Sequence, residues 1–117
     1  MNGNPIIVND LMLAGRVVGI GPLWEDGVGV QHMRFRLAYH QRQPAEAPER
    51  EIDVESAGGV ARHCQYVVSM GAEVLVDGEI AELPGEDLVE KLVVRAWKVH
   101  VLGRPEVGIE KGKENGK

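Results

Sequence analysis

Residues 51–80 read EIDVESAGGVARHCQYVVSMGAEVLVDGEI, and this stretch decides the fold. Its start, EIDVES, alternates apolar and acidic residues, which indicates a short strand. The next apolar residues recur at helical spacing, at Val60, Cys64, Val67 and Val68. We therefore expect one short helix over residues 58–69, with Ser56 as its N-cap and Gly71 just beyond its end. A further strand is expected where apolar residues alternate with acids, at Ala72, Val74, Val76 and Ile80.

One strand and a hairpin loop are expected near the start of the chain. Residues 8–20, VNDLMLAGRVVGI, alternate in the manner of a strand, and Gly15 marks a bend or bulge in it. Residues 21–29, GPLWEDGVG, concentrate glycine, proline and acids, which are common in turns. This composition predicts a hairpin loop that contains Trp24, with its ring exposed.

The second expected strand, QHMRFRLAYHQRQ at residues 31–43, has two chemically different faces. Met33, Phe35 and Leu37 share one parity, and we expect them to fill the core. The other parity carries a basic stripe of His32, Arg34, Arg36, His40 and Arg42. No acid lies between Val28 and Ala45, although the net charge of the chain is -5. Such a stripe is either a solvated strand face or part of a surface that binds anions.

The expected elements follow the order strand, strand, strand, helix, strand, strand. The last strand, LVEKLVVRAWKVHVLG at residues 88–103, has apolar residues on both faces, as expected when both are covered. A helix between the third and fourth of five strands is the layout of the OB fold, so we expect an all-β, five-stranded OB-fold barrel over residues 1–103. A simple antiparallel sheet crossed by a helix gives the same order. The polar residues 104–117 are expected to form a flexible, disordered tail.

The composition excludes several classes of function. A chain of 117 residues is the length of one domain, and a single cysteine, Cys64, leaves no internal disulfide and suits the reducing cytoplasm. No apolar stretch is long enough to cross a membrane. His63 and Cys64 are adjacent on the expected helix and would point in different directions, so they do not suggest a catalytic pair. The four histidines and one cysteine match no metal-ligand spacing. We expect no enzymatic activity, no metal and no cofactor.

Residues along most of the chain resemble a known family. The matching positions are Asn9, Leu11, Leu13, Gly15, Val17, Phe35, Leu37, Gly71, Val74, Val76, Gly78, Ile80, Ala96, Val99, Leu102 and Gly103. In their order and spacing, the chain resembles the bacterial single-stranded DNA-binding protein family, and within it the primosomal replication protein N branch. The resemblance implies an OB fold, usually assembled as a homodimer or homotetramer, that holds single-stranded DNA across its strands and loops.

Proteins that bind single strands combine a positive groove with aromatic rings on which bases stack. The expected phosphate contacts are Arg34, Arg36, His40 and Arg42, and the expected stacking residues are Trp24 and Tyr39. Tyr39 shares the parity of the core residues, so it is either buried or emerges at the strand end beside His40. Trp97 in the last strand is better explained as a core or subunit-interface residue, with stacking as the second interpretation.

Two functions remain open from the sequence. The first is a binder of single-stranded DNA or RNA that acts in replication, restart or recombination, with other replication proteins as further partners. The second is an OB-fold protein-interaction or assembly module with little nucleic-acid binding. The second is favoured by the negative net charge and by the acidic turn ELPGED at residues 82–87. It is also favoured by the shortage of aromatic residues, which are two Trp, two Tyr and one Phe. Self-association fits both, because a small barrel cannot bury both faces of its last strand.

Overall fold

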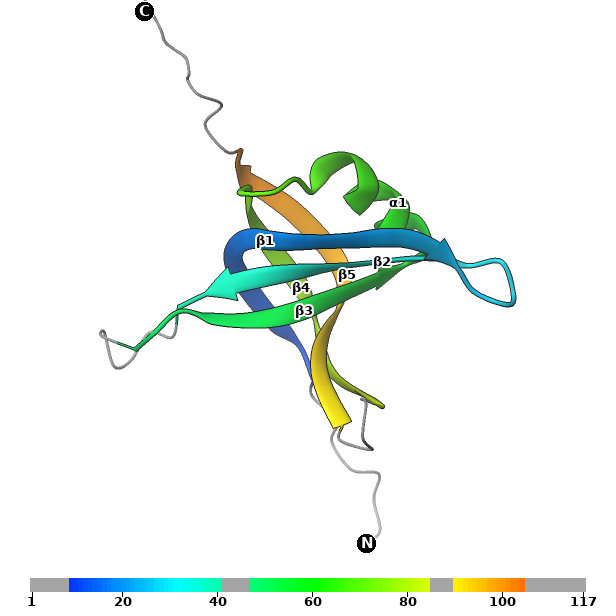
Figure 1. Cartoon of the computed structure of the whole chain (residues 1–117), viewed down its shortest axis with the longest axis horizontal. Coiled ribbons are helices and arrows are strands. Elements are labelled where there is room, and N and C mark those ends of the chain that lie inside the picture. Colours follow the sequence, from blue (N-terminus) through cyan, green and yellow to red (C-terminus); the bar gives the residue numbers. More distant parts are fainter. Residues whose placement is uncertain (1–8, 41–46, 85–89, 105–117) are drawn as a thin grey trace, which may run out of the picture.

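Five strands form a closed barrel, and one helix packs against it from outside (Figure 1). The structure, a computed structural model, describes residues 9–40, 47–84 and 90–104. Its elements are β1 Leu11–Glu25, β2 Gln31–Tyr39, β3 Arg50–Ala57, α1 Gly58–Val67, β4 Glu73–Pro84 and β5 Glu90–Gly103. The expected OB-fold barrel, with its helix between the third and fourth strands, is confirmed. Closure of the barrel excludes the open antiparallel sheet.

The long, bent strand β1 closes the barrel by pairing with two neighbours. Residues 11–16 pair with β4, and residues 16–25 pair with β2, with register shifts in the second segment. A glycine is required at Gly15, because a Cβ there would collide with the Ala38 carbonyl oxygen and lie 2.6 Å from Leu37 Cδ2. β3 pairs with β2 in antiparallel and with β5 in parallel orientation. β2 and β3 therefore lie side by side and present one continuous outer surface.

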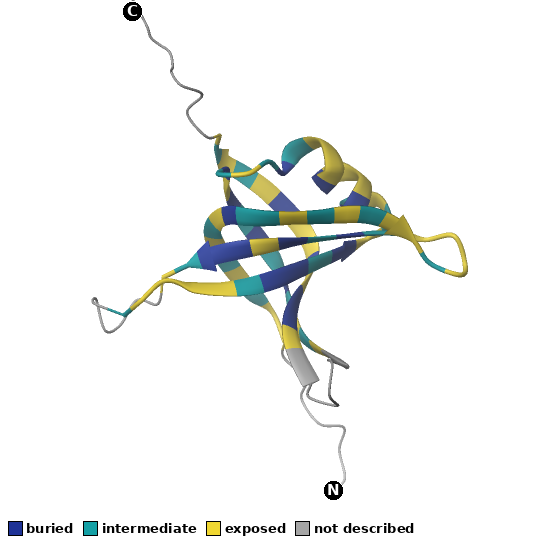
Figure 2. Cartoon of the chain, viewed as in Figure 1, coloured by how far each residue is buried: buried dark blue, intermediate teal, exposed yellow. Residues whose placement is uncertain are grey.

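Alternate residues of each strand fill the interior of the barrel (Figure 2). Met33, Phe35 and Leu37 are buried, which confirms the expected core face of β2. The other strands contribute mainly valines, namely Val17, Val54, Val74, Val76, Val94 and Val99. α1 adds Ala61 and Cys64 to the same core. Because the core positions follow the strand alternation, the opposite parity of β2 is directed outward.

Three local expectations near the helix and the first hairpin are wrong. Ser56 does not cap α1: the N-cap is Ala57, which makes no side-chain hydrogen bond, and the Ser56 hydroxyl donates instead to the Met33 carbonyl oxygen at 3.1 Å. The helix also ends at Val67 rather than at residue 69. Trp24 does not lie in a loop, because β1 continues to residue 25 and the turn begins only at Asp26.

In the described part of the chain, β5 is covered on both faces only over part of its length. The consecutive residues Val93 and Val94 point to opposite faces and are both buried, as expected. Leu92, Trp97 and Leu102 are exposed, so Trp97 is not a core residue.

Several expectations concern residues outside the described ranges. These are the phosphate contact Arg42, residues 85–87 of the acidic turn, and nearly all of the tail at residues 104–117. In the part of the chain that the structure describes, no helix combines the length and apolar character needed to cross a membrane.

Candidate nucleic-acid interface

The basic face of β2 lies directly beside an acidic face of β3. In the antiparallel register, Arg34 is opposite Glu55 and Arg36 is opposite Asp53. Opposite residues in an antiparallel pair point to the same face, with Cβ atoms about 4.5–5.5 Å apart. The acidic alternation of EIDVES and the basic alternation of β2 therefore combine into one surface of facing charges.

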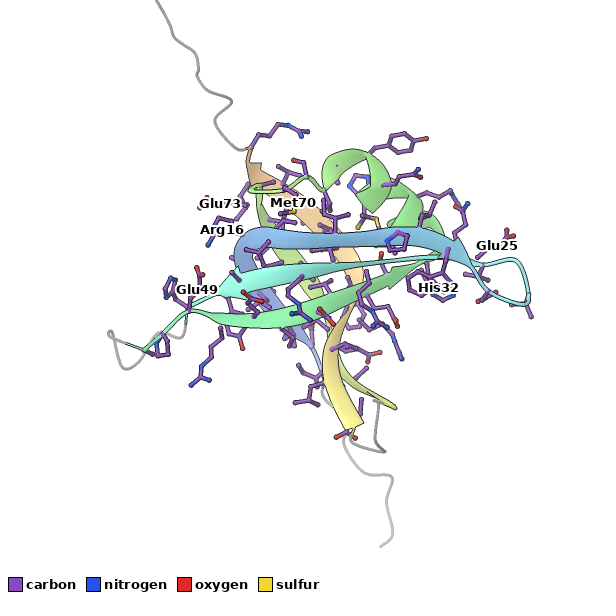
Figure 3. All side chains as sticks on the ribbon, in the orientation of Figure 1. Arg16, Glu25, His32, Glu49, Met70 and Glu73 are labelled. Carbon is purple, nitrogen blue, oxygen red and sulfur yellow. The ribbon has the colours of Figure 1, made fainter. Side chains whose placement is uncertain are left out.

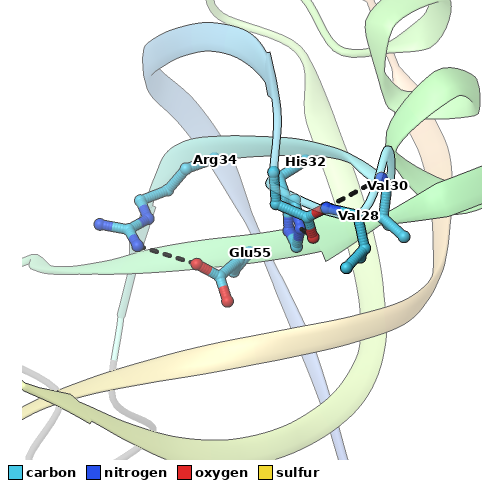
Figure 4. Close-up of polar contacts among 6 residues, drawn as sticks. Val28, Val30, His32, Arg34 and Glu55 are labelled. Carbon is cyan, nitrogen blue, oxygen red and sulfur yellow. Dashed lines mark hydrogen bonds and ion pairs between the residues drawn. The ribbon is translucent and has the colours of Figure 1, made fainter.

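Each described arginine of the stripe is ion-paired across the two strands. Arg34 Nη2 donates to Glu55 Oε2 at 2.8 Å (Figure 4), and Arg36 Nε donates to Asp53 Oδ1 at 2.9 Å. Arg36 Nη1 also lies 3.6 Å from Glu51 Oε1. The hydrogen bond to Asp53 and its negative charge raise the pKa of Arg36, which therefore stays charged. Because two arginines face three carboxylates, the surface is far less positive than β2 alone suggests.

The turn that follows β1 is held by hydrogen bonds to the Asp26 side chain, and it fixes His32 against the Trp24 ring. The indole stacks on His32, with ring centroids 5.2 Å apart and an interplanar angle of 16°. His32 Nε2 lies 2.7 Å from Asp26 Oδ2, and Asp26 Oδ1 accepts hydrogen bonds from the backbone N–H groups of Val28 and Val30 (Figure 4). These bonds, led by that of His32, lower the pKa of Asp26 to about 2. Trp24 is nevertheless 39% exposed, so an ordered ring is accessible to a ligand.

Trp24, Arg34 and Arg36 line one open hollow of about 460 Å³, which we call the Trp24 hollow. The remaining lining residues are Gly19, Gly21, Pro22, Phe35 and Asp53. The two glycines contribute no side chains to the hollow. Small-ligand sites typically have volumes of about 300–1,000 Å³. The hollow can therefore hold one planar ring beside the indole, with an attached anion near the guanidinium groups.

Tyr39 and His40 lie away from this hollow, at the other end of β2. They line a second hollow of about 360 Å³, whose other lining residues are Ala14, Gly15, Arg16, Ala38, Glu73 and Leu102. Tyr39 is half-buried, so the interpretation that it emerges beside His40 is the correct one. His40 Nε2 lies 3.6 Å from Glu49 Oε2, which also pairs with Arg16 at 3.1 Å. Figure 3 shows Arg16 and Glu49 at one end of the barrel and His32 at the other.

The sequence reasoning missed the acids that complete the site. Asp53 and Glu55 are predicted only as parts of a strand, and their role depends on the register of β3 against β2, a tertiary feature. Their shared parity in EIDVES is the signal that could have identified them. Asp26 could have been identified from the Asp-Gly pair at residues 26–27, because aspartate in a turn commonly accepts backbone hydrogen bonds.

Two observations on the described residues bear on the metal and cysteine chemistry considered from the sequence. Among the described residues, no three or more His, Cys, Asp or Glu side chains gather closely enough to hold a metal ion. Cys64 is buried, and burial raises the pKa of its thiol, whereas a nucleophilic cysteine needs a lowered pKa. The neighbouring His63 is exposed, so the two side chains point in different directions.

Comparison with known proteins shows similarity at the level of the fold. No protein-family model matches the chain, and no curated protein matches it in sequence. Its fold is similar to the SSB domain of a protein from Synechococcus sp., with a TM-score of 0.67, 15% identity, and coverage of 83% of this chain and 99% of that one. It is also similar to PriB from Ralstonia solanacearum, with a TM-score of 0.66, 21% identity, and coverage of 81% and 99%. A second PriB structure from that organism has a TM-score of 0.67 and 20% identity, and the match covers 82% of this chain and 99% of that one.

Proposed function

We propose that this protein binds single-stranded DNA through the Trp24 hollow. The observation that carries the proposal is the meeting of an ordered, exposed indole with two guanidinium groups in one hollow. The hollow involves β2 and β3, and OB folds bind oligonucleotides on the face of these strands. The similarity in fold to an SSB domain and to PriB supports the same role. The corresponding setting is the bacterial cytoplasm, where replication and replication restart expose single strands.

The ring and the arginines contribute differently to binding. Stacking of one base on Trp24 contributes about 1–3 kcal/mol. Arg34 and Arg36 reach phosphates only by exchanging carboxylate partners that they already hold, so their net contribution is smaller. Each phosphate contact to a single strand adds about -0.7 to the slope of log affinity against log salt, which gives about -1.4 for two contacts. We therefore expect moderate affinity with a shallow dependence on salt.

Titration of labelled oligo-dT at low salt, followed by fluorescence anisotropy, tests the proposal. Trp24→Leu removes the ring and should weaken binding about 5- to 150-fold, the equivalent of one lost stack. Trp24→Phe retains an aromatic ring and should lose less affinity for oligo-dT than Trp24→Leu. Arg104→Gln removes one positive charge from a residue outside the hollow and should leave affinity almost unchanged. The proposal is wrong if micromolar protein has no affinity for oligo-dT, or if Trp24→Leu binds as well as the unchanged protein.

The ion pairs favour a second candidate, a protein-interaction module that retains the barrel without the nucleic-acid role. Arg34 and Arg36 already form ion pairs with acids of β3, so their charges do not require an anionic ligand. A protein partner recovered from native cytosol, stable to nuclease treatment, would favour this function if oligo-dT binding were absent.

Self-association is proposed with either function. Leu92 and Leu102 are large apolar side chains of β5 that are exposed, and a second copy could cover them. Sedimentation that finds only monomer at high micromolar concentration would contradict it.

A further inference from the structure

A second exposed tryptophan lies in a separate hollow between α1 and β5. Trp97 is 43% exposed and lines an open hollow of about 380 Å³, which we call the Trp97 hollow. The other lining residues are Gly59, Val60, His63, Lys98, Val99 and His100. None of them lines the Trp24 hollow, so each of the two tryptophans of the chain belongs to its own site.

A bulge in β5 lets two consecutive side chains, Trp97 and Lys98, both face outward. In the pairing of β4 with β5, Gly78 is opposite Ala96 and Asp77 is opposite Lys98, so Trp97 is the extra residue. Trp97 and Lys98 are consecutive and both exposed, which regular alternation would forbid. A Cβ on Gly78 would overlap the Arg95 carbonyl oxygen and lie 3.0 Å from Ala96 Cα, so the close approach of the strands here requires glycine. Bulges commonly re-aim side chains next to functional sites.

The Trp97 hollow has the unopposed charge that the Trp24 hollow lacks. Its polar lining residues are Lys98, His63 and His100, whose side chains can all donate hydrogen bonds, and no acid among the residues that the structure describes lines it. Within residues 9–40, 47–84 and 90–104, none of these three side chains forms an ion pair. Asp77 is the nearest acid in the register, opposite Lys98, but no ion pair joins them.

From this geometry we infer that the Trp97 hollow binds a nucleotide unit, with the base against the indole and the phosphate at Lys98 and the two histidines. The hollow has the size of a small-ligand site, its apolar residues Val60 and Val99 suit a planar ring, and its charge complements a phosphate. The unit is either a free nucleotide or one nucleotide of a single strand, which share this chemistry. The inference goes beyond the proposed function, because the two hollows have no residue in common.

The two tryptophans allow each site to be measured alone. In Trp24→Phe, Trp97 is the only indole, and its fluorescence should be quenched saturably by thymidine monophosphate, by oligo-dT, or by both. A response to the mononucleotide identifies a free nucleotide as a sufficient ligand, and a response to oligo-dT alone identifies a strand. Thymidine, which lacks the phosphate, should bind more weakly than its monophosphate.

Lys98→Gln in the Trp24→Phe background should weaken binding about tenfold, the effect of losing one charge-assisted hydrogen bond. Arg95→Gln on the same strand, outside the hollow, is the matched control and should change little. Circular dichroism confirms that each variant is folded. The inference is overturned if neither thymidine monophosphate nor oligo-dT quenches the Trp97 fluorescence. It is also overturned if only a glutamate-rich peptide quenches that fluorescence saturably. If Trp24 in a Trp97→Phe protein still responds to oligo-dT, the proposed function survives that failure.

Discussion

Removing one acid from β3 should tighten the binding of single-stranded DNA. Glu55→Gln keeps the shape of the side chain and an oxygen that can accept from Arg34 Nη2, now 2.8 Å from Glu55 Oε2, but removes the charge. A phosphate on the same guanidinium would lie within roughly 6 Å of the Glu55 carboxylate, where two unit charges in a largely aqueous dielectric repel by about 1 kcal/mol. Relief of that repulsion corresponds to about fivefold tighter binding. Anisotropy titrations of oligo-dT at low salt measure this gain.

Salt and a matched variant separate this local effect from a change in net charge. The gain from Glu55→Gln should nearly vanish at about 1 M salt, where the Debye length is about 3 Å. Glu82→Gln removes the same charge from an exposed residue of β4 that does not line the Trp24 hollow. It should leave affinity nearly unchanged. If Glu55→Gln binds no more tightly than the unchanged protein, or if Glu82→Gln gains as much, Arg34 does not contact phosphate in competition with Glu55.

Three further predictions concern the fold around the site. Gly15→Ala should lower the free energy of unfolding in urea by about 1–3 kcal/mol, because its Cβ meets Leu37 and the Ala38 carbonyl, whereas Gly27→Ala has open space and should change stability little. Asp26→Asn should lower the melting temperature at neutral pH. Since the pKa of Asp26 falls from 3.8 to about 2 on folding, its stabilisation is complete above about pH 4 and lost toward pH 2, where the melting temperatures of the two proteins should converge. A melting-temperature difference that persists at pH 2 would contradict this. Cys64 should react slowly with thiol reagents in the folded protein and rapidly in urea, because burial shields the thiol and raises its pKa; equal rates would show that it is accessible.

The core of the barrel was predictable because it depends on local alternation. The parity of Met33, Phe35 and Leu37 assigns one face of β2 to the interior, since a strand that buries the other parity would bury arginines. The position of the helix followed from the change from alternating to helical spacing after residue 56. Each of these two signals is carried by residues that lie within a few positions of one another in the sequence.

Features that depend on pairing between distant segments were not predictable. Glycine and proline at residues 19–22 are typical of turns, but in this chain they accommodate register shifts within β1, so Trp24 remains on a strand. The neutralisation of Arg34 and Arg36 depends on the register of β3 against β2. The joint exposure of Trp97 and Lys98 depends on the bulge opposite Gly78. In each case the residue types are visible in the sequence, but their partners are fixed only by the closed barrel.

In the proposed complex with single-stranded DNA, the ion pairs of Arg34 and Arg36 make stacking on the Trp24 ring the main source of binding energy. Trp24 is already ordered by its stack on His32 and by the capped turn at Asp26, so a base that stacks on it loses little additional freedom of the protein. Each arginine must instead give up a hydrogen-bonded carboxylate before it gains a phosphate, and the net charge of -5 opposes the approach of DNA. Binding dominated by stacking explains how an acidic barrel with so few aromatic residues could still hold a single strand. It also implies that affinity should follow the stacking strength of the base in contact with Trp24 more closely than the number of phosphates.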